Sequence, residues 1–99
     1  MMDNELLELA KEYLRIDGDQ DDKLLGLLIK SAKEYFANAG VEEQGSQLYQ
    51  LGIMMLVTQW YENRQQNEFG KISSAIEMGL QTIILQLKAG DLVDQSSKV

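Results

Sequence analysis

The sequence predicts an all-α fold, a small helical bundle of about four helices, and three observations support it. Apolar side chains recur at three- and four-residue spacing in the segments 5–15, 21–39 and 76–87, the period of amphipathic helices. The segment Leu48 to Tyr61 is apolar at nearly every position, so a helix there must be covered on all sides. The connections between segments are short, which favours antiparallel neighbours. We therefore expect one central, almost wholly apolar helix surrounded by the others.

The composition excludes most catalytic and metal-binding chemistry. The 99 residues include no cysteine and no histidine, which removes disulfides, thiolate nucleophiles, the usual general base and the usual transition-metal ligands. We expect no catalytic residue, no cofactor and no metal, and therefore not an enzyme. The net charge of −7 argues against a nucleic-acid reader, because phosphate binding requires clustered lysine and arginine.

The N-terminal stretch MMDNELLEL lacks the basic start and continuous apolar segment of a signal peptide, so we expect the chain to stay in the cytoplasm where it is made. As a helix, the central apolar segment would reach only roughly 21 Å, against a bilayer hydrocarbon core of roughly 30 Å. We expect a buried helix there and no membrane span.

The first helix is expected from Glu5 to about Arg15, with Asp3 or Asn4 as its N-cap. Its basic residues follow its acidic ones, which is the order that the helix dipole favours. The expected inner face consists of Leu6, Leu9, Ala10, Tyr13 and Leu14.

The acidic segment Asp17 to Asp22 begins like a calcium-binding EF loop, with aspartate at alternate positions. Such a loop needs glycine at its sixth position and a bidentate glutamate at its twelfth, where this chain has an aspartate and Leu28. We therefore expect a plain turn. In it, Gly18 takes a left-handed conformation and Asp19 or Asp21 caps the next helix.

The second helix is expected from about Asp21 to Ala39, where Gly40 ends it, and Ser46 is placed to cap the central helix. Aromatic residues in register with a leucine stripe are expected in the core and not in a ligand site. The expected inner face consists of Leu24, Leu25, Leu28, Ile29, Ala32, Tyr35, Phe36 and Ala39.

The polar segment Gln65 to Lys71 is expected to form a projecting loop before the last helix. Ser74 and Glu77 match a capping box, and Gly90 is expected to end the helix. Residues 91–99 are expected to be a flexible tail, so that the folded domain spans residues 1–90. The predicted core includes Leu28, Ala32, Leu51, Val57, Ile83 and Leu87.

Four stretches in order, ELLELAKEYLRIDGDQDD, LLGLLIKSAKEYFANAG, LGIMMLVTQWYENRQ and MGLQTIILQLKAG, resemble the head-tail connector proteins, also called head completion or adaptor proteins, of tailed bacteriophages and prophages. The resemblance covers about Leu6 to Gly90. Its most specific parts are LRID at Leu14 to Asp17, DD at Asp21-Asp22 and WYENR at Trp60 to Arg64. The resemblance implies a structural virion protein without catalytic activity.

The resemblance also implies partners and a location. It implies a homo-oligomeric ring under the portal protein, and the expected ring is a dodecamer. It is also compatible with a free protein that is monomeric before assembly. The ring would join the head to a tail-side head completion protein, with DNA passing through it without sequence-specific binding. The implied location is the head-tail interface of the virion, after assembly in the host cytoplasm, with no membrane partner.

Arg64 is the one base in the WYENR motif. It lies two residues from Glu62, and residues at that spacing do not share a helix face. We expect it to reach the acidic turn in the same subunit or the next. Ordinary core packing is the favoured interpretation of Met54, Met55 and Trp60, whereas the loop and the tail are expected to contact neighbours. The candidate contact residues are Arg64, Glu62, Asp17, Asp19, Asp22, Trp60, Met54, Met55, Asn67, Glu68, Phe69, Lys71, Leu92 and Val93.

Two other classes of function have the same composition. A non-catalytic regulatory or scaffolding helical bundle would be a stable monomer or dimer that forms no ring at high concentration. An enzyme would need a polar cleft built from aspartate, glutamate, lysine or tyrosine, and no spacing in the chain suggests one.

Overall fold

The computed structural model describes residues 3–63 and 74–97, with side chains described within 4–63 and 74–90. Four helices follow one another: α1 (Asp3–Leu14), α2 (Asp22–Asn38), α3 (Gln47–Asn63) and α4 (Ser74–Ser97). The described residues contain no strand. The predicted all-α fold is therefore confirmed.

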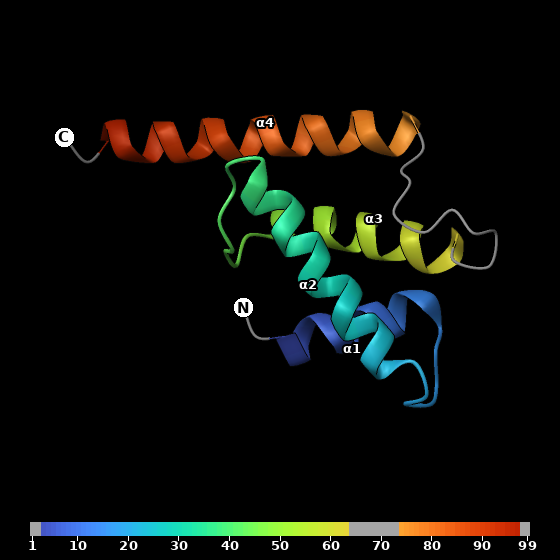
Figure 1. Ribbon diagram of the computed structural model, residues 1–99. Helices are drawn as coiled ribbons and strands as arrows, with labels where there is room; N and C mark the ends of the chain where they lie inside the picture. Colours follow the sequence, from blue (N-terminus) through green and yellow to red (C-terminus); the bar gives the residue numbers. More distant parts are fainter. Residues whose placement is uncertain (1–2, 64–73, 98–99) are drawn as a thin grey trace.

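Helix α3 is the centre of the bundle, because it packs against α1, α2 and α4. Figure 1 shows α1 and α4 on opposite sides of α3, with α2 running across from one to the other. The C-terminal part of α4, drawn in red, extends past the other three helices. The predicted central apolar helix is thus confirmed. The first and last helices, α1 and α4, lie on opposite sides of it.

The core is built around the contact between α2 and α3. The ring of Phe36 meets the ring of Tyr49 edge-on, with centroids 5.4 Å apart and an interplanar angle of 89°. A Cβ atom at Gly52 would lie 2.8 Å from Cε2 of Phe36 and closer still to Cζ, so only glycine allows this approach. Of the predicted core residues, five are buried: Leu28, Ala32, Val57, Ile83 and Leu87.

Leu51 corrects the predicted core. Its side chain is 49% exposed, although it lies in the most apolar helix of the chain. Tyr13, expected on the inner face of α1, is 66% exposed. Both side chains line an open groove between α1 and α3, so the bundle leaves this side of its most apolar helix uncovered.

Two helix ends agree with the sequence prediction. The Tyr49 N–H donates a hydrogen bond of 3.2 Å to the Ser46 hydroxyl oxygen, which confirms Ser46 as a cap. Gly40 has φ 94° and ends α2, and the following Val41 N–H donates to the Phe36 carbonyl at 2.8 Å. Since Val41 and Phe36 are both buried, the apolar contact typical of this motif closes the helix.

The end of α1 differs from the prediction, because Arg15 and not Gly18 takes the left-handed conformation, with φ 59°. The Ile16 N–H donates to the Lys11 carbonyl at 2.9 Å, and the Arg15 N–H donates to the Glu12 carbonyl at 3.2 Å. These two bonds satisfy two of the last carbonyl groups of α1 before the chain reaches Gly18.

Three further boundaries need correction. Helix α1 begins at Asp3, so Asp3 and Asn4 both lie inside it and neither is its N-cap. Asp21 occupies the N-cap position of α2 but makes no side-chain capping bond. Helix α4 does not end at Gly90 and continues to Ser97. The predicted loop 65–71 lies outside the described residues, and the flexibility of residues 91–99 stays a prediction.

Candidate interaction surfaces

The two most specific sequence motifs meet in space. The Tyr61 hydroxyl, near the end of α3, donates a hydrogen bond to the carboxylate of Asp21, in the turn before α2. This bond uses Asp21 Oδ2 and explains why that side chain does not cap α2. The WYENR segment and the acidic turn therefore form one contact, although 40 residues separate Tyr61 from Asp21.

An ion pair fixes α1 to the start of α2. Lys11 Nζ lies 3.0 Å from Asp22 Oδ1. The hydrogen bond to Asp22 raises the pKa of Lys11 above its ordinary value, and the nearby charges of Asp22, Glu8 and Asp19 add to this, whereas burial acts against it. Asp22 is thus already engaged within its own subunit.

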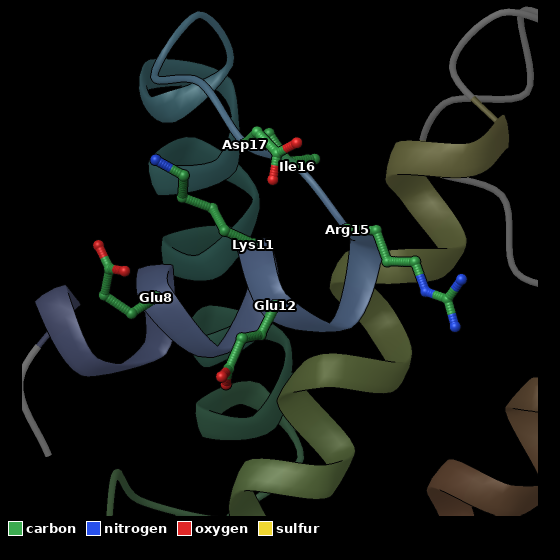
Figure 2. Close-up of a pocket in the computed structure, with 6 residues that line it drawn as sticks. All are labelled: Glu8, Lys11, Glu12, Arg15, Ile16 and Asp17. Carbon is green, nitrogen blue, oxygen red and sulfur yellow. The ribbon is translucent and has the colours of Figure 1, made fainter.

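An open groove of about 400 Å³ lies along α1 and the turn that follows it. Its side chains do not converge on one point, and Figure 2 shows the Arg15 guanidinium directed away from the other charged groups. Within the described part of the chain, no group of three or more carboxylates comes close enough to hold a metal ion. The groove suits a charged contact better than a reaction. It is lined by Glu8, Lys11, Glu12, Arg15, Ile16 and Asp17.

Arg15 was not among the residues singled out from the sequence. Its side chain is exposed, and it makes no ion pair with any described residue. Its left-handed backbone is uncommon for a residue other than glycine. No sequence signal marks such a residue, since arginine at a helix end is ordinarily a solvated charge that complements the helix dipole.

A second, apolar groove lies between α1 and α3. It is formed mainly by Leu9, Tyr13, Leu51 and Met54, with Gln47 and Gln50 also lining it. A separate apolar surface lies on α4, where Met78 is 69% and Leu85 is 67% exposed. Large exposed apolar groups that gather in this way mark contact surfaces.

The candidate contact residues divide by position. Asp17 and Asp19 are exposed in the turn, and Glu62 is exposed in the last turn of α3. Met54 and Trp60 are buried, with exposures of 4% and 7%, which confirms the core interpretation for both. Met55 is half-buried and packs against the core. Arg64, Asn67, Glu68, Phe69 and Lys71 lie outside the described residues, and Leu92 and Val93 lie on α4 where side chains are not described.

Comparisons with known proteins complete the description. The family model of phage gp6-like head-tail connector proteins matches residues 4–88. No curated protein and no solved structure matches the chain. Among the described residues, no helix has the length and apolar character that crossing a membrane requires.

Proposed function

The chain belongs to the phage gp6-like head-tail connector family, and we propose that it assembles as a closed ring of identical subunits beneath the portal protein. In this role it joins the DNA-filled head to the tail-side head completion protein and lets DNA pass through the ring. It is a structural component of the phage connector and acts by binding its neighbours.

The extent of the family match carries the proposal. Residues 4–88 include nearly all of α1, all of α2 and α3, and the part of α4 that contacts the core. The similarity therefore covers the whole packed unit and not one helical segment, which an unrelated bundle could share. The net charge of −7 suits a passage through which DNA slides, because like charges do not hold the phosphate backbone.

The candidate contacts at the end of α3 belong to this proposal. The Tyr61–Asp21 hydrogen bond brings the end of α3 beside the acidic turn, which supports a contact between Arg64 and an aspartate there, in the same subunit or the next. We also propose that the segment 65–74 and the tail 91–99 contact neighbouring proteins, since function tends to lie on segments without a core stripe.

Deletion of the gene from its phage or prophage tests the proposed function. We expect the deleted phage to accumulate DNA-filled heads and separate tails, and we expect the gene supplied in trans to restore joined particles. Infectious particles that form at the normal yield without this chain would overturn the proposal. A Leu27→Ser variant is a suitable control for the complementation, because Leu27 is 57% exposed, lies on α2 between the exposed Lys23 and Lys30, and belongs to neither apolar surface.

A further inference from the structure

We propose that copies of this chain join through two different apolar surfaces: the α1–α3 groove of one copy receives the outer stripe of α4 from the next copy. The groove is defined by Leu9, Tyr13, Leu51 and Met54, and the outer stripe by Met78 and Leu85. This inference rests on the proposed function, because it assumes that several copies assemble together.

The exposed apolar side chains are not scattered. Within the described residues, the large exposed ones are Tyr13, Leu27, Leu51, Met78 and Leu85. Tyr13 and Leu51 meet in the groove, and Met78 and Leu85 share one helix. Only Leu27 stands alone, and scattered single residues of this kind need no partner.

The groove offers a concave surface for a helix. Its volume is about 230 Å³, and its apolar residues come from two packed helices that hold it open. Leu51 is exposed on α3, although the next two residues, Gly52 and Ile53, are buried. The bundle thus leaves one side of its most apolar helix uncovered.

The outer stripe has the geometry of a helix that inserts into such a groove. Met78 and Leu85 are seven residues apart, which places them on one face, two turns from each other. The core-facing residues Leu80, Ile83 and Leu87 are buried and lie on the opposite face of α4. The outer face of α4 therefore carries two exposed apolar side chains, with the exposed Gln81 and Thr82 between them.

The position of the two surfaces identifies the occupant as a second copy. The groove includes α1 and the stripe is on α4, and these helices lie on opposite sides of α3 (Figure 1). Two different surfaces on opposite sides give a head-to-tail contact that repeats from copy to copy and can close into a ring. A two-fold dimer would instead use one surface twice.

The charges at the two surfaces are complementary when α4 of the next copy runs antiparallel to α1. Arg15 directly follows α1, the helix that contributes Leu9 and Tyr13 to the groove, whereas Glu77 is next to Met78 at the start of α4. Both side chains are exposed, and neither makes an ion pair with a described residue. At the other end of the contact, exposed Lys88 lies three residues after Leu85 and exposed Glu5 lies in the first turn of α1. Opposite charges therefore meet at both ends.

The contact is small, so we expect the free protein to stay monomeric when dilute. A few apolar side chains bury far less surface than a stable protein–protein interface needs. When the copies close into a ring, or bind to an existing ring of portal subunits, the groove of one copy is held close to the outer stripe of the next. This raises the effective concentration of the two surfaces. The contact then forms without a strong affinity between two isolated copies.

Cysteine cross-linking tests the pairing, because the chain contains no cysteine of its own. The variants Leu51→Cys and Leu85→Cys are mixed, and a double variant carrying both is made, in concentrated protein and in assembled particles. Oxidation or a short bifunctional maleimide should join Leu51→Cys to Leu85→Cys and neither to itself, while the double variant should give a ladder of covalent oligomers. Leu27→Cys is the matched control, with similar exposure, and should remain uncross-linked.

Charge reversal tests the orientation. Arg15→Glu and Glu77→Arg should each lower the yield of the ladder severalfold, and the two changes together should restore it, because the ion pair re-forms with opposite signs. Failure of the double change to restore the ladder would overturn the antiparallel arrangement.

Three results would overturn the pairing: a Leu51→Cys product joined only to itself, equal cross-linking of Leu27→Cys, or no ladder in assembled particles. The proposed function fails in a different way. Particles that carry the chain at the head-tail joint but give no ladder contradict the pairing alone. A ladder from the concentrated protein, together with normal joining in the deleted phage, contradicts the proposed function alone.

Discussion

Arg15 ends α1 in a left-handed backbone conformation, with φ 59°, at a position where glycine is the common residue. An L-residue in this region costs roughly 1–2 kcal/mol, which glycine does not incur. Arg15→Gly should therefore raise the free energy of unfolding by about 1 kcal/mol, as urea denaturation would measure. Arg15→Ala keeps the steric cost and is the control. An Arg15→Gly protein no more stable than Arg15→Ala would contradict the strained turn.

Tyr49, at the centre of the core, carries a buried hydroxyl oxygen that has no hydrogen-bond partner among the described residues. Leaving such a group unsatisfied costs about 1–3 kcal/mol, and replacing it with an apolar group of the same shape is neutral or stabilising. Tyr49→Phe should therefore unfold at an equal or higher urea concentration at pH 7. A clearly lower midpoint would show that the hydroxyl makes a contact that stabilises the fold.

The raised pKa of Tyr49 predicts how the stability of the fold changes at high pH. Burial raises the pKa of Tyr49 above its ordinary value of 10.0, the Glu43 charge adds to this and Lys33 acts against it. The unfolded chain therefore loses its tyrosine proton at lower pH than the folded chain, so stability falls as pH rises above about 10. The raised pKa of Lys11 acts in the same direction above its ordinary 10.5. Tyr49→Phe should make the loss between pH 9 and 11 shallower, and an unchanged slope would contradict this.

At the residue scale, the sequence predicted burial correctly where helical periodicity determines it. It failed where contacts with residues distant in sequence determine what a side chain does. Val57 and Leu87 are buried as predicted, because their spacing places them on a covered face. Asp19 or Asp21 was predicted to cap α2, but the Asp21 carboxylate instead accepts a hydrogen bond from Tyr61, which lies on a helix distant in sequence. Leu51 was predicted in the core, but how far α1 reaches along α3 depends on packing and not on the period of either helix.

Two glycines show how closely the helices pack. Gly52 of α3 faces the Phe36 ring, whereas a Cβ atom at Gly26 of α2 would meet nothing within 4 Å. Gly52→Ala should lower the free energy of unfolding by about 1–3 kcal/mol, because overpacking displaces neighbouring side chains. Gly26→Ala, the matched control, should raise it by about 0.5–1 kcal/mol, since alanine favours the helix. Thermal unfolding of both variants checks this, and similar changes in both would contradict the close crossing of α2 and α3.

A glycine predicted the end of a helix correctly where the residue that follows the glycine is buried in the core. After Gly40 comes Val41, which is buried with Phe36, so the left-handed turn gains an apolar contact. After Gly90 comes Asp91, which is a polar residue, and α4 continues to Ser97. A glycine alone therefore does not end a helix, and its cost inside one, about 1 kcal/mol, is small enough to be tolerated.

Across the whole molecule, the arrangement of helices leaves apolar side chains on opposite sides of one small bundle. Fold class and family were both predicted from the order of the helical stretches, and the family match to residues 4–88 confirms the second. The candidate contacts were less predictable from sequence. Arg64 stood out through its motif, whereas Tyr13, Leu51, Met78 and Leu85 were recognised as surface groups only from packing.

The central claim is that identical copies of this chain form a closed ring at the joint between head and tail. Electron cryomicroscopy of purified particles, combined with a count of copies per particle by quantitative mass spectrometry, tests it most directly. The expected result is a ring of density at the portal vertex into which copies of this bundle fit, with a copy number that matches the symmetry of the ring. A single copy per particle, or copies spread over the capsid lattice away from the portal vertex, would contradict the claim.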